Sequence, residues 1–453
     1  MRDQSAFGTD TRNEFRGCDP GAPGFTLMPN EKHWSRTIGD DVFRGAIERS
    51  NADLIPRPLS IYLHIPFCAT LCYHCNRHKK VTRNRSMIAA YVDTLVREMT
   101  GKAVLFDRDR MVRSLRVGGG TPVYLKPGQI SHLMANLRTN FSMPRDGDRD
   151  YAIDIDPRSV TTRDLQNLAW HGFNRVQLAV QGMSRVTELA INRAQSDHQV
   201  RFAIAKSRDA GIDEVGVLFR YGLPAQTLQL AERSLSQLLT TGPASVRLAA
   251  YCHDPAHNPA QRLVPETLLP AADVRNAMFI ALRDRLIDAG YQFLGPDQFA
   301  LPNSALFNAQ RTGSLARHIG GFSSNAGHDM LGLGLAAVSR IDEHLFQNAT
   351  EIDRYSEAIA DGGSAIVKGR LANDQERAQS QVVQDLLCQG RCDKSAWEDS
   401  FKQPFDQYFK AALDRLNDYA RAGAIALEPQ HIVILPPGMT YLDRIIGCFQ
   451  STK

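Results

Sequence analysis

Short apolar strands alternate with amphipathic helical stretches from Ser60 to Gly290, and this alternation leaves few folds open to the chain. Each apolar run is followed by a segment whose apolar residues recur at helical spacing. Six such units with short connections predict an α/β fold, in which a parallel sheet is closed or partly closed into a barrel. The expected strands are SIYLHIP (60–66), SLRVGGGTP (114–122), YAIDIDP (151–157), RVQLAVQG (175–182), DEVGVLFRYGLP (213–224) and SVRLAAYCHDP (245–255).

The length of 453 residues exceeds what one small core accommodates, so we expect more than one domain. An N-terminal arm with one helix near 40–50 is expected over 1–56, and the (β/α)6 barrel over 57–290. Residues 291–365 are rich in glycine and predict a loop-rich extension that covers the active site. Residues 366–453 predict a small, mainly helical C-terminal domain with a winged-helix character.

Three of the eight cysteines lie close together in the sequence HIPFCATLCYHCN, as Cys68, Cys72 and Cys75. Thiolates are the protein ligands that hold iron–sulfur clusters. Three of them on one loop would leave the fourth iron of a cubane open to a small chelating ligand. The loop follows the first expected strand, at the carboxyl end of the sheet, where parallel α/β folds place their chemistry. The spacing therefore predicts a [4Fe–4S] cluster.

Two other interpretations of this loop stay open from the spacing alone. Structural zinc normally has four protein ligands, and His74 or His78 could be the fourth, although the spacing is unusual for zinc. Alternatively, the three thiols are ordinary buried side chains. The remaining cysteines are scattered, unlike a secreted disulfide framework, which favours a reducing compartment.

Composition and charge exclude several classes of protein. The net charge of +4 is small for this length, and basic residues are mixed with acidic ones, so no nucleic-acid partner is expected. No apolar stretch is long enough to predict insertion into a membrane. The polar N-terminus has no apolar signal-peptide segment. We expect a cytoplasmic protein and, because no exposed apolar stripe suggests a partner, a monomer.

Several longer motifs point to one family. They are YLHIPFCxxLCYxC (62–75), KxVTR (79–83), GGGTPxYL (118–125), IDP (155–157), GFNRVQLAVQ (172–181), NRAQ (192–195), YGLPAQT (221–227) and DMLGLGLAAVS (329–339). With these motifs the chain resembles the radical S-adenosylmethionine (SAM) superfamily and, within it, the oxygen-independent coproporphyrinogen III oxidases of haem biosynthesis. The resemblance runs from about Pro58 to Phe449 and implies a partial (β/α)6 radical SAM barrel.

The resemblance also implies a reaction. Two SAM molecules would bind in one site, and the first, on the cluster, would be reductively cleaved to methionine and a 5′-deoxyadenosyl radical. That radical would take a hydrogen from the β-carbon of a propionate. Loss of CO2 and one electron would leave a vinyl group, and two such steps would convert coproporphyrinogen III to protoporphyrinogen IX. The implied partners are the tetrapyrrole and an unidentified electron donor.

The family's cofactor contacts carry over to matching positions of this sequence. Tyr62, Gly119 and Asp154 would contact the first SAM, and His74 would lie beside an adenine ring. Gly120, Thr121 and Arg193 would contact the second SAM, with Arg193 on a helix and facing a carboxylate. The glycines would let the backbone approach the ligand and offer N–H groups to carboxylates. No catalytic residue is assigned beyond the cluster, and the expected cofactor contacts are completed by Gln181, Cys252 and Val338.

Several positions depart from the family pattern. Asn76 and Arg77 replace a Gly-Cys pair after Cys75, and Asp154 replaces a glutamate. Leu218 replaces an aspartate that contacts the second SAM. The N-terminal signature of the family survives only as GFTLMP (24–29), and GPDQFALP (295–302) and HIGGFSSNAGHD (318–329) match in part.

These departures keep two other functions open. A paralogue with the same radical-generating site could act on another substrate, for example in methyl transfer with the second SAM as carbon donor. A haem-binding or haem-transfer protein is the other alternative, with His64, His253, His318 and His328 as candidate axial ligands. An isolated histidine, however, is more often a hydrogen-bonded structural residue.

Overall fold

The computed structural model describes residues 34–35, 38–145, 147, 149–318, 321–324 and 326–450. Cys18, the GFTLMP signature and the greater part of the expected N-terminal arm lie outside these residues. The helix expected near 40–50 is present as α1 (Asp40–Asn51), whose Phe43, Ala46 and Ile47 are buried.

Six parallel strands form the centre of one large sheet, and they are the six that the sequence predicted. They pair in the order β1-β4-β5-β6-β7-β8, with every pair parallel. Apolar side chains fill the sheet: Ile61, Leu63 and Ile65 of β1 are all at most 1% exposed. The α/β prediction is confirmed. The strand bounds are β1 Leu59–Ile65, β4 Val112–Gly119, β5 Asp150–Ile155, β6 Arg175–Val180, β7 Glu214–Tyr221 and β8 Ser245–Ala250.

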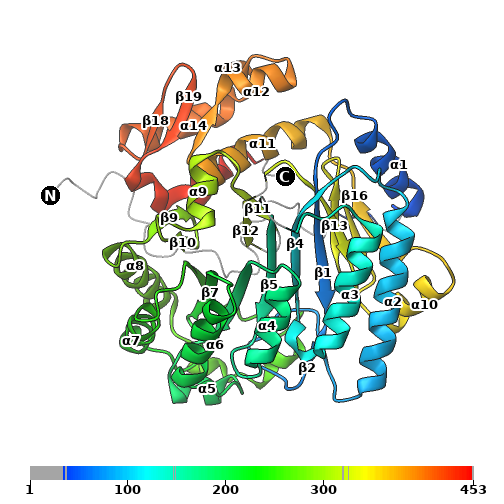
Figure 1. Cartoon of the computed structure of the whole chain (residues 1–453). Coiled ribbons are helices and arrows are strands. Elements are labelled where there is room, and N and C mark those ends of the chain that lie inside the picture. Colours follow the sequence, from blue (N-terminus) through cyan, green and yellow to red (C-terminus); the bar gives the residue numbers. More distant parts are fainter. Residues whose placement is uncertain are drawn as a thin grey trace.

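Helices between these strands cover the outer face of the sheet (Figure 1). Their starts follow from capping chemistry, because a side-chain oxygen before the first turn accepts from backbone N–H groups. The capping residue is Asn84 for α2, Thr161 for α4, Ser196 for α6 and Thr227 for α7. The bounds are α2 Arg85–Ala103, α3 Pro127–Asn140, α4 Thr162–Trp170, α5 Arg185–Ala190, α6 Asp197–Asp209, α7 Leu228–Leu239 and α8 Ala272–Asp288.

The segment 291–365 differs from the loop-rich extension that the sequence predicted. Its strands widen the central sheet at both edges: β13 pairs in parallel with β1 and is followed by antiparallel β14 and β15, while β10 and β9 follow β8. The edge strand β16, which pairs with β15, begins just after this segment. Short strands with glycines between them give no clear period, so the pattern resembled loops. The strand bounds are β9 Gln292–Gly295, β10 Gln298–Ala300, β13 Asp329–Leu333, β14 Val338–Ile341, β15 His344–Asn348 and β16 Ile366–Arg370, and two helices, α9 (Ala305–Arg311) and α10 (Ile352–Ala360), lie among them.

A two-stranded ribbon, β11 (Ala316–His318) with β12 (Gly321–Ser323), packs against the start of the parallel strands. Arg175 of β6 donates to the Phe322 carbonyl (3.4 Å) and pairs with Asp150 of β5 (2.6 Å). Asp297 accepts from Arg247 and Arg317, both at 2.7 Å, and these cations hold the pKa of its carboxyl far below the usual range. Buried and half-buried ion pairs therefore close this end of the sheet.

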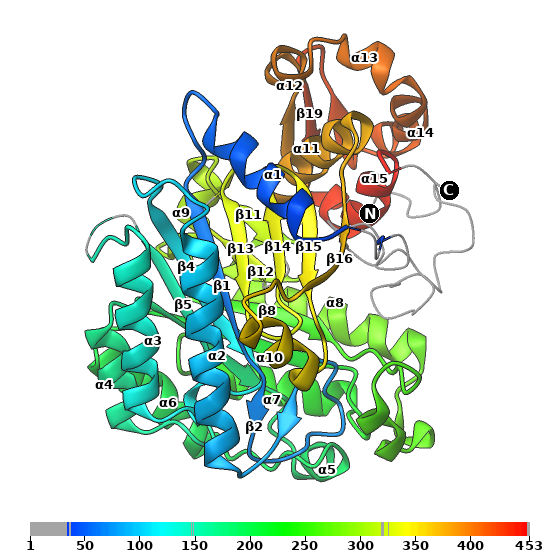
Figure 2. The same ribbon diagram turned by 90° about the vertical axis from the view of Figure 1, so that its right-hand side faces the viewer.

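The C-terminal region forms a second, smaller core that packs on α9 and on β9–β12. It lies at the end of the sheet opposite to the short strand β2 (Phe67–Cys68), which pairs with β3 (Lys80–Val81) (Figures 1 and 2). None of the helices that the structure describes is long and apolar enough to cross a membrane. The elements are α11 Asp374–Gln389, β17 Arg391–Asp393, α12 Lys394–Phe401, α13 Phe405–Tyr408, α14 Lys410–Arg421, β18 Ile425–Leu427, β19 His431–Ile434 and α15 Leu442–Gly447.

Candidate active site

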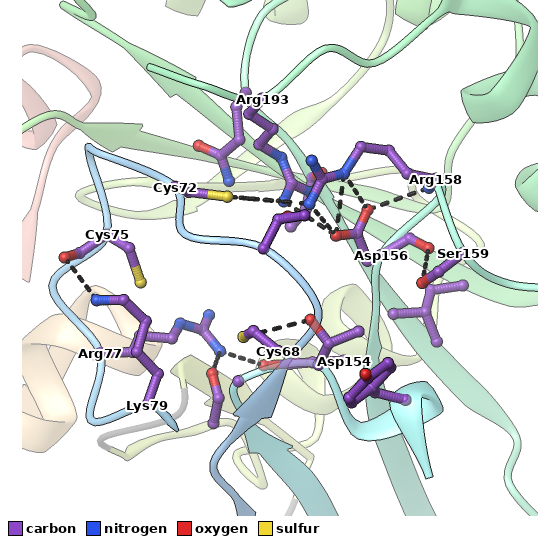
Figure 3. A pocket seen from close by; sticks show the side chains of 18 of the residues that line it. Cys68, Cys72, Cys75, Arg77, Lys79, Asp154, Asp156, Arg158, Ser159 and Arg193 are labelled. Carbon is purple, nitrogen blue, oxygen red and sulfur yellow. Dashed lines mark hydrogen bonds and ion pairs between the residues drawn. The ribbon is translucent and has the colours of Figure 1, made fainter. Parts of the chain in front are cut away.

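A cavity of about 300 Å³ opens at the carboxyl ends of the parallel strands (Figure 3). Its walls come from the cysteine loop after β1, from the ends of β4 to β7, and from the loop before α6. The sequence predicted chemistry at this end of the sheet. The lining includes Cys68, Cys72, Cys75, Arg77, Lys79, Gly119, Gly120, Thr121, Asp154, Asp156, Arg158, Gln181, Arg193, Leu218 and Arg220.

All three cysteines of the loop line this cavity, and hydrogen-bond donors stand beside two of the thiols. Thr121 Oγ1 donates to Cys68 Sγ (3.6 Å). Arg193 and Arg158 donate to Cys72 Sγ at 3.7 and 3.9 Å. Burial raises the pKa of the Cys68 thiol to about 11, and coordination to a metal is the usual way in which such a thiol is deprotonated.

The glycine segment after β4 is packed against the start of the cysteine loop. Gly120 N–H donates to the Ile65 carbonyl (2.8 Å) and Thr121 N–H to the Phe67 carbonyl (2.9 Å). A Cβ at Gly120 would stand 2.7 Å from the backbone oxygens of Pro66 and Phe67. The N–H group of Gly120, which was expected to face a ligand carboxylate, is therefore used within the protein, as is that of Thr121. The glycines are needed for close packing of two backbone segments.

A cluster of charges joins β5 to the loop that follows α5. Asp156 pairs with Arg158 (2.7 Å) and with Arg193 (3.0 Å). These cations lower the pKa of the Asp156 carboxyl to about 2 despite its burial. Arg193 was expected on a helix, but α5 ends at Ala190 and Asn192 has φ +51°, so Arg193 lies in a loop.

Asp154, at the end of β5, has both carboxylate oxygens occupied by arginines. Arg77 donates to Oδ2 (2.7 Å) and Arg116 to Oδ1 (2.6 Å), which lower the pKa of this buried carboxyl. Arg77 also donates to the Gly119 carbonyl (3.1 Å). The departure at residue 77 therefore puts a guanidinium on two groups that the resemblance assigned to the first SAM.

The opposite wall is formed by β6 and β7. Gln181 accepts a hydrogen bond from Arg220 Nε (2.9 Å), and Leu218 contributes an apolar surface between β6 and β8. His74 reaches the cavity from the cysteine loop and is only 5% exposed. Burial and the nearby Arg220 and Arg193 lower the pKa of His74 well below the usual value, so its ring is neutral.

Ten of the thirteen site residues that the sequence singled out line this one cavity: Cys68, Cys72, Cys75, His74, Gly119, Gly120, Thr121, Asp154, Gln181 and Arg193. Tyr62 lies behind the wall, where its ring is close to the Cα of Gly118 and its hydroxyl bonds to His64 Nδ1 (3.1 Å). Cys252, just after β8, and Val338, packed with Trp34 and Leu345, are not part of the lining.

The histidines considered as haem ligands are engaged by the protein, and the partners of three of them are as follows. His64 Nε2 is 2.9 Å from the His78 carbonyl oxygen, and burial lowers the pKa of this ring to about 4. His253 Nδ1 is 2.9 Å from the Tyr251 hydroxyl, and His328 Nδ1 is 3.1 Å from Ser60 Oγ. These contacts give the three rings ordinary structural roles.

Sequence reasoning missed several residues of the cavity, namely Lys79, Asp156, Arg158, Gln177 and Arg220. Two signals could have found them. Asp156 and Arg158 directly follow β5, at the sheet end where polar residues collect. Because side chains two or four residues apart in a strand point to the same face, Gln177 lies on the same face as Gln181, and Arg220 on the same face as Leu218.

The donor set fits an iron–sulfur cluster. Three thiols surround one cavity, two of them beside hydrogen-bond donors, and cationic side chains stand near enough to balance the negative charge of a thiolate-bound cluster. Within the described ranges, no three His, Cys, Asp or Glu side chains are gathered as they would be around one metal ion.

The fold and the three-cysteine loop agree with a known class of enzyme. Residues 62–238 match the family model of the Radical SAM superfamily, and they run from β1 through β7 into α7, which includes five of the six central strands. That superfamily comprises iron–sulfur enzymes that act on SAM.

Curated relatives narrow the class. Oxygen-independent coproporphyrinogen III oxidase from Salmonella typhimurium is 33% identical over 95% of this chain and 92% of that protein. The enzyme of the same name from Pseudomonas aeruginosa is 33% identical, covering 96% and 94%. The solved structure of coproporphyrinogen III oxidase from Escherichia coli, a radical SAM enzyme, superposes with a TM-score of 0.88 at 32% identity, covering 93% and 96%. The chain thus belongs to the oxygen-independent coproporphyrinogen III oxidase family of radical SAM oxidoreductases.

Proposed function

We propose that this protein converts two propionates of coproporphyrinogen III to vinyl groups without oxygen, giving protoporphyrinogen IX in haem biosynthesis. The observation that carries the proposal is the cavity with Cys68, Cys72 and Cys75 on one wall, in a chain that aligns over nearly its whole length with oxidases of that name. Each propionate loses one hydrogen atom, one electron and CO2, and the electron leaves to an acceptor.

A [4Fe–4S] cluster on the three cysteines would supply the one-electron chemistry that turns SAM into a hydrogen-abstracting agent. The residues of the chain would set its surroundings. Arg158 and Arg193 donate toward the Cys72 sulfur and Thr121 toward the Cys68 sulfur, and such contacts orient ligands and adjust a cluster's potential. Asp156 keeps both arginines in place.

The proposal includes two SAM molecules per chain. Tyr62, Gly119 and Asp154 are proposed for the first and Gly120, Thr121 and Arg193 for the second, with His74, Gln181, Cys252 and Val338 as further contacts. Most of these residues line one cavity, and this supports the arrangement. Counting SAM molecules bound to the reconstituted protein by equilibrium dialysis tests it: two per chain are expected, and one would refute the second site.

We also propose that the protein works as a cytoplasmic monomer with a separate electron donor. A cluster held by thiolates and the scattered free cysteines both need a reducing compartment. Light scattering on the anaerobic protein checks the oligomeric state, and a mass near twice 50.3 kDa would contradict the monomer.

The function is tested with anaerobically reconstituted protein, coproporphyrinogen III, SAM and a reductant. Release of CO2 together with a vinyl-bearing porphyrinogen is expected, and Cys72→Ser should give neither product. Cleavage of SAM without CO2 release would overturn the decarboxylase proposal while keeping the radical chemistry.

One observation favours a second candidate, a paralogue that acts on another substrate. Arg77 donates hydrogen bonds to Asp154 and to the Gly119 carbonyl. Leu218 puts an apolar side chain where the family has a hydrogen-bond acceptor. Both changes lie in the cavity itself. Turnover of SAM that is stimulated by a substrate other than coproporphyrinogen III would support this candidate.

A further inference from the structure

The side chains of the cavity carry more positive than negative charge. Five cations line it, Arg77, Lys79, Arg158, Arg193 and Arg220, against two carboxylates, Asp154 and Asp156. Asp154 is paired with Arg77, and Asp156 with Arg158 and Arg193. Among the residues that the structure describes, no carboxylate pairs with Lys79 or Arg220.

The two unpaired cations differ in position. Lys79 belongs to the cysteine loop and donates to the Cys75 carbonyl (3.3 Å), so it supports that loop. Arg220 lies on the opposite wall, near the carboxyl end of β7. Its neutral partners there are Gln181 Oε1 (2.9 Å) and, at 3.5 Å, the Ala250 carbonyl. A guanidinium has five N–H donors in a planar fork, and these contacts leave part of that fork for a ligand.

Two more polar atoms of the same cavity have no partner within the described part of the chain. They are Nδ1 of His74, a residue 5% exposed, and Nε2 of Gln177 on β6, four residues before Gln181. Buried polar atoms without partners are uncommon and cost free energy, so these two show that the polar groups around the cavity are not fully satisfied by the protein itself.

We propose that Arg220 is the anchor for a carboxylate of a ligand bound in this cavity. The inference rests on the proposed function, which brings two carboxylate-bearing molecules to the site. One source is the amino-acid carboxylate of a second SAM, for which the proposed partner Arg193 is already shared with Asp156. The other is a propionate of the tetrapyrrole. A planar guanidinium matches a carboxylate in either, with two parallel hydrogen bonds.

The test measures binding to the full-length protein with its cluster reconstituted, and needs no turnover. Arg220→Met removes the charge at similar length, and Arg220→Lys keeps it without the fork. Lys206→Met, on the exposed face of α6, is the matched control for loss of one positive charge. Dissociation constants are measured for SAM and decarboxylated SAM, and for coproporphyrin III and its tetramethyl ester.

If the carboxylate comes from SAM, Arg220→Met weakens binding of the second SAM by roughly 10- to 100-fold, which is the range for a charge-assisted hydrogen bond in a buried site. Decarboxylated SAM then binds to all variants with the same affinity. If it comes from the tetrapyrrole, coproporphyrin III shows that loss and the ester does not. Arg220→Lys recovers part of the affinity in both cases.

Two results would overturn the inference. In one, no carboxylate ligand changes affinity by more than about twofold. In the other, Arg220→Met loses iron and the absorbance of the cluster, which would show that Arg220 balances the cluster charge. Failure of the proposed function has a different signature, since wild-type protein would then form no vinyl product while the dependence of binding on Arg220 persists.

Discussion

The two walls of the cavity are built in different ways. The wall of the cysteine loop and the glycine segment is fixed by backbone hydrogen bonds, from Gly120 to Ile65 and from Thr121 to Phe67, and carries the motifs typical of the family. The wall of β6 and β7 meets the cavity through side chains, and the departures Leu218 on this wall and Arg77 on the cysteine loop both act through their side chains. Radical generation is thus tied to the backbone, whereas ligand choice depends on side chains that can change without disturbing the fold.

The largest effect is expected on the first wall. Cys72→Ser should leave protein with much less iron and no detectable SAM cleavage, because a serine is a poor ligand for a cluster iron. Iron analysis and visible absorbance of the anaerobic protein measure it. Cys252→Ser, outside the cavity lining, is the matched control and should keep full iron content. Equal iron in both variants would remove the basis for distinguishing the two walls.

Gly120→Ala tests the backbone character of the first wall. Its Cβ would stand 2.7 Å from two backbone oxygens that cannot move independently of the loop. We expect a loss of roughly 2–3 kcal/mol in unfolding free energy, and incomplete cluster assembly. Urea denaturation measures the first and iron content the second. Gly128→Ala in α3, where a Cβ meets nothing within 4 Å, should cost almost nothing; a similar loss there would contradict the packing argument.

A pH titration tests the charge cluster that joins the walls. The pKa of Asp156 is lowered to about 2 from an ordinary value near 4. A lowered folded-state pKa stabilises the fold above the unfolded pKa, and this contribution, of order 2 kcal/mol, is lost as the pH falls from about 4 to about 2. Asp156→Asn should be less stable at neutral pH and should lose less stability over that interval.

The measurement is the urea midpoint of the cluster-free protein against pH. Asp93→Asn on the exposed face of α2 controls for the removal of one carboxylate. Parallel curves for wild type and Asp156→Asn between pH 2 and 4 would show that the ion pairs of Asp156 contribute little.

The sequence predicted the backbone of the first wall better than the side-chain contacts of the cavity, for physical reasons. Six strands and the cysteine loop follow from local periodicity and spacing, which are visible in one segment of chain. Arg77 contacts Asp154, which is 77 positions away in the sequence. The direction in which the side chain of Arg220 points depends on the register of β7 against β6 and β8. Tertiary register of this kind leaves no local pattern. No local pattern marks Gly120 either, because a glycine is needed there only to avoid the backbone oxygens of Pro66 and Phe67.

The smallest effect is expected for Arg77→Met, which changes a side chain of the cysteine loop. Arg77 occupies Asp154 Oδ2 and the Gly119 carbonyl, two acceptors suited to the ammonium group of SAM, and its own charge repels the sulfonium. Removing it should therefore tighten SAM binding by about 3- to 10-fold, the worth of one hydrogen bond. Arg116 still pairs with Asp154, so that carboxylate keeps a counter-ion and the fold should be unaffected. Calorimetric titration with SAM measures the change, and Arg77→Lys should resemble the wild type. Weaker binding in Arg77→Met would mean that Arg77 itself holds the cofactor, and a side chain would then share in the chemistry that we assign to the backbone of the first wall.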